Sequence, residues 1–217
     1  LSAGADLIKI FITGTLRGPK GIPSYFSKEE IHAAVGEAHR LGVPVATHCI
    51  GGIGLKWALE TGIDTIEHGY FLMDKEIDLL AKSDSWLVMT PSIFFTDARI
   101  RTLPPHLVEG HLQQRDEVAQ RMRAAIKAGI KFAVGTDGMH GGLAQEIQYL
   151  VDFGATPSQA LMAATCHAAK VCGLEGSIGT LEPGKFGDII GVEGNPLEDI
   201  GALKRVKTVV SGGKIKH

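Results

Sequence analysis

The chain has 217 residues, of which 44% are hydrophobic, so it is long enough and apolar enough to bury one sizeable core. Its 22 lysines and arginines nearly balance its 24 aspartates and glutamates, for a formal net charge of −2, and this balance argues against nucleic acid or an anionic membrane as a partner. The longest apolar runs are strand-sized, far below the roughly 18 residues that a membrane-spanning helix needs.

The cysteine content is consistent with a reducing compartment. Cys49, Cys166 and Cys172 are odd in number and show no C-x-x-C spacing, which fits a free-thiol protein better than a disulfide framework. We therefore expect a cytoplasmic protein.

The first predicted elements alternate between strand and helix. The apolar, β-branched run LIKIFIT (7–13) predicts a strand that contains Lys9, and a Gly- and Pro-rich loop follows it. Ser27 and Glu30 have the spacing of a capping box, which predicts a helix ending near Gly42.

Two apolar runs then end in a histidine each. Val43–Thr47 precedes His48 and Ile63–Glu67 precedes His68, with residues for one amphipathic helix between them. Because side chains at the carboxyl ends of barrel strands converge on one mouth, this spacing predicts two imidazoles that face a common point. The GGIG segment at 51–54 lacks both phosphate-loop spacings, and we expect its glycines to allow a close backbone approach instead.

The remaining elements continue the alternation. In chain order they are a helix at 74–83, a strand at 86–92, a long helical pattern from about 104 to 129, a strand at 130–137 that ends in Asp137, and a helix capped by Thr156 with Pro157 at its first position. From about Gly176 the chain has short β segments separated by turns, which predict a small separate β-sheet. Alternating strands and helices favour a parallel α/β sheet.

The sequence predicts a set of metal ligands, namely Lys9, His48, His68 and Asp137. An ammonium inside an apolar run is costly to bury without a partner, whereas a neutral lysine amine can take up carbon dioxide and become an anionic carbamate. Two histidines, one aspartate and a carboxylated Lys9 would suit zinc. The alternatives are that the histidines are surface or capping residues, that Asp137 only caps a turn, and that Lys9 extends from a sheet edge into solvent.

The same segments carry a family resemblance. GADLIKI, THCIGG, TIEHG, VGTD and the stretch from ALMAATCHAAK to NPLEDI resemble, in order and essentially end to end, the metal-dependent amidohydrolase superfamily, in the branch of Xaa-Pro dipeptidases and imidazolonepropionase-like proteins. The resemblance implies a TIM-like (β/α)8 barrel with a small composite β-sandwich. It also implies one or two zinc-like ions, with carboxylated Lys9 bridging them, His48 and His68 binding the second, and Asp137 binding the first and moving the proton.

One departure from the family concerns completeness. The family opens its barrel with a His-x-His pair, and the sequence contains no such pair. The first residues also resemble the fourth barrel strand. We therefore expect the C-terminal part of the barrel at 1–175 and C-terminal sandwich strands at 176–217, with a missing N-terminal half as partner.

Substrate contacts are expected from loops after two strands. Phe94, Phe95 and Arg99 follow the strand at 86–92, and His140 follows Asp137. Prolidase-like members carry a tyrosine two residues after the His48 position, where this chain has Ile50, which disfavours a free-carboxylate dipeptide substrate. His167 and Cys166 are expected to pack a helix. The remaining histidines are expected to be solvated, namely His32, His39, His106, His111 and His217.

Three functions follow. The first is hydrolysis of a C–N bond in a small-molecule amide, cyclic amide, dipeptide, carbamate or urea through metal-activated water, in a protein that could form a homo-oligomer. The second is an inactive fragment of such an enzyme. The third is a metal-dependent phosphoester or lactone hydrolase, since one site can serve several chemistries.

Overall fold

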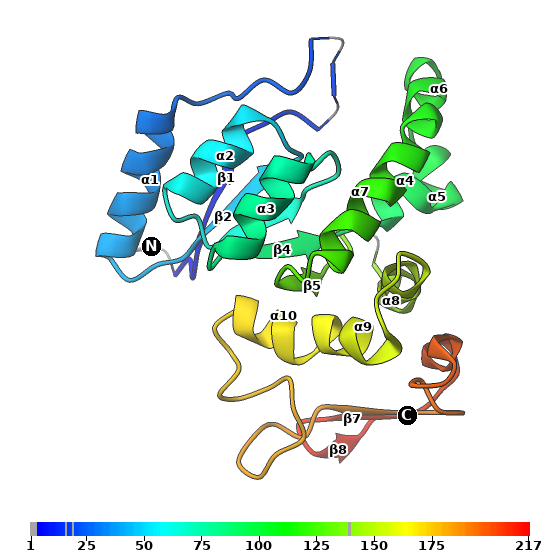
Figure 1. Cartoon of the computed structure of the whole chain (residues 1–217). Helices are drawn as coiled ribbons and strands as arrows, with labels where there is room; N and C mark the ends of the chain where they lie inside the picture. Colours follow the sequence, from blue (N-terminus) through cyan, green and yellow to red (C-terminus); the bar gives the residue numbers. More distant parts are fainter. Residues whose placement is uncertain (1–3, 16, 19, 139) are drawn as a thin grey trace. The chain divides into compact units, whose positions relative to one another are not determined.

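Figure 1 shows the computed structural model of the chain, which describes residues 4–15, 17–18, 20–138 and 140–217. The chain forms two compact units. The first contains the described residues up to Met89 together with Ile100–Phe132. The second contains Thr90–Arg99 and Ala133–His217.

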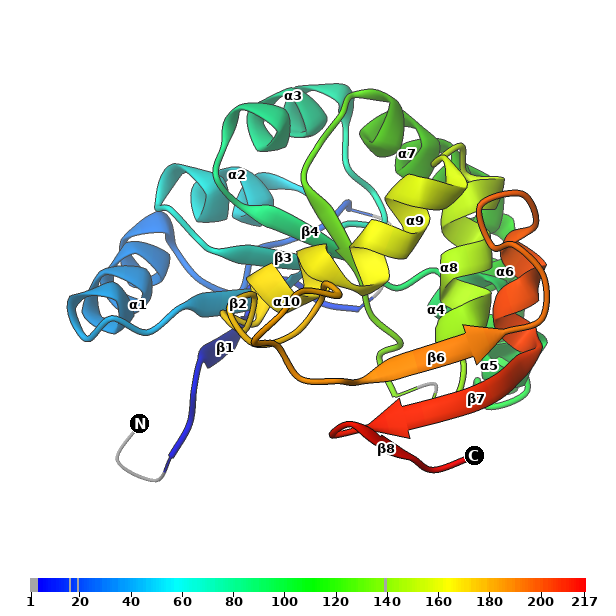
Figure 2. The same ribbon diagram turned by 90° about the horizontal axis from the view of Figure 1, so that it is seen from below.

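The first unit is built on a parallel sheet. Its strands are β1 (Ile8–Phe11), β2 (Val45–Cys49), β3 (Thr65–His68) and β4 (Trp86–Met89), and they pair in chain order. The helices that return the chain between them are α1 (Lys28–Arg40), α2 (Ile53–Glu60) and α3 (Asp74–Lys82), and they lie along one face of the strands in Figure 2. Parallel strands need such crossovers, and the α/β prediction is confirmed.

β5 (Phe132–Val134) begins beside β4, where the Leu87 N–H donates to the carbonyl of Lys131 at 2.9 Å. The region before it differs from the single long helix predicted at 104–129. It forms α6 (Pro105–Gln113) and α7 (Arg115–Lys127), separated at Gln114. The prediction that His111 is solvated was wrong, because α6 packs against α7 and leaves His111 only 4% exposed.

Two local predictions in the first unit are confirmed. The Ser27 hydroxyl accepts a hydrogen bond from the Glu30 N–H, and the Glu30 carboxylate accepts one from the Ser27 N–H, so the capping box starts α1. Gly51 permits a close approach, because a Cβ there would lie 2.8 Å from the carbonyl oxygen of Phe71. This is the backbone contact expected where the His48 strand turns toward its helix.

The second unit combines helices with a small antiparallel sheet. Its helices are α4 (Ser92–Phe95), most of α5 (Asp97–Ile100), α8 (Leu143–Asp152), α9 (Pro157–Ala164), α10 (Cys166–Val171) and the 3₁₀ helix η1 (Ile200–Lys204). The sheet contains β6 (Ile189–Val192), β7 (Val206–Ser211) and β8 (Lys214–Ile215). The predicted cap of α9 is confirmed, because the Thr156 hydroxyl accepts from the Gln159 N–H and Pro157 is at the first helical position.

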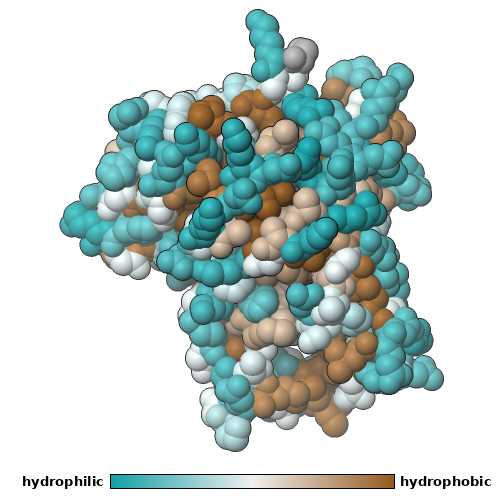
Figure 3. Space-filling view, in the orientation of Figure 1, coloured by the Kyte–Doolittle hydropathy of each residue, from teal (hydrophilic) through white to brown (hydrophobic). Residues whose placement is uncertain are grey.

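The tail of the second unit presents apolar side chains to the surface. Ile190 is 52% exposed and Ile215 is 77% exposed, and Figure 3 shows hydrophobic residues gathered over this sheet. The division of the chain at residue 176 remains a prediction. In the described part of the chain, no helix is both long enough and apolar enough to cross a bilayer.

Candidate functional site

His48 and His68 lie side by side at the ends of neighbouring strands. Their ring centroids are 4.6 Å apart, in an edge-to-face arrangement, and each residue is 5% exposed. β2 and β3 pair in parallel, with Cys49 opposite His68, so the two histidines sit at nearly the same level of the sheet. The pairing predicted from the two strand ends is therefore present in the structure.

The backbone turns His68 toward His48. Side chains alternate between the faces of a strand, and Glu67 is directly opposite His48 in the register, so a regular strand would direct His68 to the other face. His68 instead has φ = 81°, a left-handed conformation that is uncommon for a residue with a Cβ. Strain of this kind costs on the order of 1–3 kcal/mol and tends to occur at functional sites.

Lys9 reaches the same face of the sheet. Phe11, two residues after Lys9, pairs with His48 in the register, which puts Lys9 on the His48 face. The Lys9 ammonium lies 3.4 Å from a carboxylate oxygen of Glu67, and the Lys9 side chain is 35% exposed. The strand prediction and the expectation of a polar partner for Lys9 both hold.

Neighbouring groups orient the two imidazoles. The Phe11 ring stacks on His48 with centroids 4.9 Å apart, and Nε2 of His48 is 3.2 Å from the carbonyl oxygen of Gly14. The Tyr70 hydroxyl is hydrogen-bonded to Nδ1 of His68 at 3.2 Å. Such contacts fix the orientation of a histidine ring, as is common for metal ligands.

The electrostatics favour a neutral His68. Burial, together with repulsion from the neighbouring His48 and Lys9, lowers the pKa of His68 to about 3. Neutral imidazole is the form that binds metals. His68 can therefore donate a nitrogen lone pair near neutral pH.

Asp137 lies in the second unit, on the turn after β5, and is exposed. It has φ = 43°, and in the described part of the chain Asp137 and His68 are the two residues other than glycine with a positive φ. His140 is exposed three residues later. The functional roles predicted for both residues remain predictions.

The predicted substrate contacts after β4 also lie in the second unit. Phe94 is buried, and Arg99 is half-buried on α5. The Phe95 ring packs against Tyr149 of α8 and against Phe153, which follows α8, with centroids 5.7 Å and 5.1 Å away. Their predicted contact with substrate stays untested.

Sequence reasoning missed three polar residues near these groups. Glu67 could have been found from strand alternation, because it shares the face of His48. Tyr70 follows His68 closely, but no pattern indicated its hydrogen bond. Glu146 stands within the apolar face of α8 and is completely buried, and a lone acid on such a face is an available signal.

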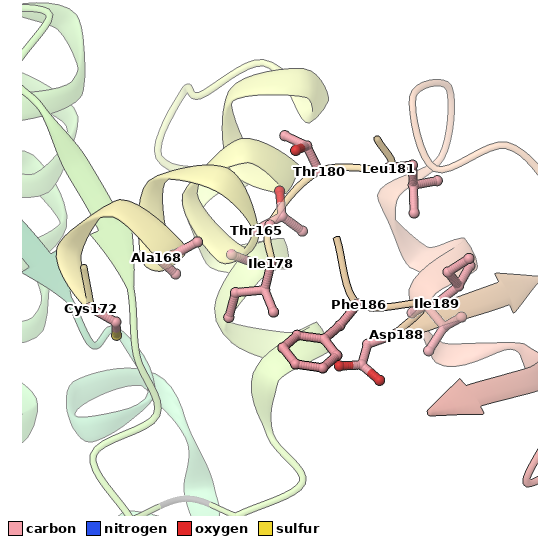
Figure 4. A pocket seen from close by; sticks show the side chains of 13 residues that line it. Thr165, Ala168, Cys172, Ile178, Thr180, Leu181, Phe186, Asp188 and Ile189 are labelled. Atoms are coloured by element: carbon pink, nitrogen blue, oxygen red, sulfur yellow. The ribbon is translucent and has the colours of Figure 1, made fainter. Parts of the chain in front are cut away.

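A cavity of about 570 Å³ lies elsewhere in the second unit. Figure 4 shows Thr165, Ala168 and Cys172 on one side of it and Ile178, Phe186 and Ile189 on the other. None of the predicted site residues lines it. Within the described ranges, no three His, Cys, Asp or Glu side chains gather as a metal-binding group, so the histidine pair is a partial ligand set.

Known proteins resemble most of the chain. It is 32% identical to ochratoxinase from Aspergillus niger, with 98% of this chain and 46% of that protein covered. An imidazolonepropionase from Acinetobacter baumannii is 27% identical over 76% of this chain and 39% of its own length. The chain thus spans about half the length of the curated relatives it matches, or less.

A solved structure agrees closely in fold. A Xaa-Pro dipeptidase with methionine bound in its active site has a TM-score of 0.89 and 33% sequence identity, and the match covers 100% of this chain and 55% of that one. The family model described as the amidohydrolase family matches residues 1–216. The chain therefore belongs to the amidohydrolase family.

Proposed function

We propose that the complete protein is a metal-dependent hydrolase that cleaves a C–N bond in a small-molecule substrate of the amide, cyclic amide, dipeptide, carbamate or urea type. The observation that carries this proposal is the pair of buried imidazoles, 4.6 Å apart, at the ends of two parallel strands. Membership of the amidohydrolase family supports the reaction class. A cytoplasmic location, a homo-oligomeric state and a further N-terminal half of the barrel remain predictions.

The donor set fits a zinc-like ion. His48 and His68 offer nitrogen ligands, and the pKa of His68, lowered to about 3, keeps that ring neutral. Two nitrogens do not complete a tetrahedral site, and we assign further oxygen ligands to Asp137 and to a carboxylated Lys9. A bound zinc ion would supply a Lewis acid for the carbonyl oxygen and a water with a pKa of about 7.

Carboxylation of Lys9 would replace its positive charge with a negative one and so change its interaction with Glu67. Its ammonium forms an ion pair with Glu67 at 3.4 Å. A carbamate carries negative charge and would be repelled by the Glu67 carboxylate, so the Lys9 side chain would leave Glu67 on carboxylation. Uptake of carbon dioxide by Lys9 and loss of the Lys9–Glu67 ion pair should therefore occur together.

Asp137 is assigned the proton transfer. Its carboxylate would accept the proton of the attacking water and then donate it to the leaving nitrogen, acting as general base and then as general acid. Its exposure and its position on a turn directly after a strand are compatible with this role. Phe94, Phe95, Arg99 and His140 are proposed to contact the substrate.

Comparison with a similar protein restricts the class of substrate to test first. One solved neighbour is a Xaa-Pro dipeptidase. This chain has Ile50 where prolidase-like proteins have a tyrosine, which favours substrates other than free-carboxylate dipeptides. An N-acylated amine whose leaving group carries no carboxylate is therefore the first substrate class to test.

The test is a substrate comparison with the full-length, zinc-loaded protein. Matched amide, ester and phosphoester substrates with the same acyl or leaving group are incubated with it, and the products are identified by mass spectrometry. We expect release of free amine from the amides. Hydrolysis of the esters or phosphoesters without any amide hydrolysis would replace this proposal with the ester-hydrolase alternative.

A further inference from the structure

Glu146 is an acid with an unusual environment in the second unit. It lies in the first turn of α8 and is 0% exposed. Its Oε2 accepts a hydrogen bond from the Ser92 N–H at 2.9 Å. Its Oε1 is buried and has no hydrogen-bond partner among the described residues. A buried carboxyl group in this state needs an explanation, because unsatisfied polar atoms are costly.

The partner of Glu146 begins a short segment that α8 holds at both ends. Ser92 is the first residue of α4, is 2% exposed, and contacts Glu146 at the head of α8. At the other end of α4, Phe95 packs on Tyr149 of α8 and on Phe153, the residue that follows α8. Residues 146, 149 and 153 follow helical spacing, so one face of α8 and its C-cap contact the first and last residues of α4.

The segment is important because it follows the carboxyl end of β4. Loops at that end of barrel strands build the active sites of (β/α) barrels. Asp137 stands at the corresponding end of β5 in the chain and belongs to the same unit as Glu146. A residue that fixes α4 therefore fixes one of the two strand-end segments of this unit.

We propose that Glu146 is a positioning residue of the hydrolase, which holds the α4 segment through the Ser92 N–H, and that the hydrogen-bonding shape of its side chain is what the reaction requires rather than its negative charge. This inference rests on the proposed function. Glu146 is not itself assigned a contact with substrate or metal.

The surroundings of Glu146 support a neutral acid. Burial and, to a smaller extent, the negative charge of Asp137 raise its pKa to about 7, although the hydrogen bonds from Ser92 act in the opposite direction. Among the described residues it forms no ion pair, so no cation offsets the cost of a buried charge. A protonated carboxyl group keeps a carbonyl oxygen that accepts from Ser92.

Three variants of the full-length protein distinguish the hydrogen-bonding role of the Glu146 side chain from a role of its negative charge. Glu146→Gln keeps an acceptor of the same shape and removes the charge. Glu146→Ala removes the acceptor and leaves the Ser92 N–H without it. Asp152→Asn is the control, because it removes an exposed acid at the end of the same helix.

Two readouts are needed. The first is hydrogen exchange of the peptide that contains residues 90–95, which should be faster by about tenfold in Glu146→Ala and unchanged in Glu146→Gln and the control. The second is kinetics on the amide substrate, where Glu146→Ala should lower kcat/KM by about tenfold, mainly through KM. Below pH 7 the kcat/KM of Glu146→Gln should match that of wild type, because the glutamine and the protonated acid are both neutral side chains whose oxygen accepts from the Ser92 N–H.

Loss of activity in Glu146→Gln equal to that in Glu146→Ala, or wild-type exchange and kinetics in Glu146→Ala, would overturn the proposal. If wild-type protein hydrolysed no C–N substrate, the proposed function would fail instead, and the link between Glu146 and catalysis would fall with it. Hydrogen exchange alone would then decide whether Glu146 holds the segment.

Discussion

The buried acid Glu146 gives a prediction for stability that does not depend on activity. Its pKa is raised from 4.5 to about 7 in the folded protein. Between these pH values the folded state keeps a proton that the unfolded state has lost. The free energy of unfolding should therefore decrease as pH rises from 4.5 to 7, because the folded state binds more protons there.

The size of the effect follows from the shift. A difference of about 2.5 pKa units, at about 1.4 kcal/mol each, amounts to roughly 3.5 kcal/mol. This is an upper limit, because a protein interior relaxes around a charge. Glu146→Gln cannot ionise, so its stability relative to wild type should improve by up to that amount between pH 4.5 and 7.5.

The assay is urea unfolding of the full-length wild-type and Glu146→Gln proteins at pH 4.5, 5.5, 6.5 and 7.5, followed by circular dichroism and tryptophan fluorescence. Other titrating groups cancel in the difference between the two proteins. A difference in unfolding free energy that stays constant over this pH range would refute a neutral, buried Glu146. A difference that grows toward acid pH would show that the carboxylate is stabilised in the fold.

Three further predictions concern the proposed site. Asp137→Asn should retain more bound metal than activity, which elemental analysis and kinetics on one preparation will show, and equal losses would contradict its role in proton transfer. Lys9→Ala should lose activity and regain part of it with short carboxylic acids, and labelled bicarbonate should give a carbamate NMR signal in the wild-type protein only. Gly51→Ala should destabilise the protein by about 2–4 kcal/mol in urea unfolding, because its Cβ would lie 2.8 Å from a backbone carbonyl oxygen and its φ is 139°. Unchanged stability would contradict this close approach.

The parallel sheet could be predicted because each of its strands is a short apolar run with a helix pattern after it. Val43–Thr47 and Ile63–Glu67 gave β2 and β3 to within about two residues, and their terminal histidines meet. The capping box at Ser27 is a purely local motif, so it could also be recognised from Ser27 and Glu30, which are three positions apart. Local patterns and strand order together were sufficient for this part of the site.

The remaining features depend on contacts between distant residues. The break at Gln114 interrupts a continuous helical pattern without a Pro or Gly at that position, and the packing of α6 on α7 buries His111. The ion pair of Lys9 with Glu67 joins residues 58 positions apart in the sequence and follows from strand register, which periodicity alone does not provide. Contacts between residues that are distant in the sequence therefore determine these features, and the local sequence pattern does not predict them.

The central claim is that a metal held by His48 and His68 hydrolyses a C–N bond, and one measurement tests it most directly. Full-length wild-type protein, the His48→Ala and His68→Ala variants, and the exposed-histidine control His32→Ala are stripped with a chelator, reloaded with zinc, and assayed for bound metal and for amine release from an amide. We predict that the wild type and His32→Ala regain both, and that each site variant loses most of both. Full metal content and amine release in a His48→Ala, His68→Ala double variant would contradict the claim.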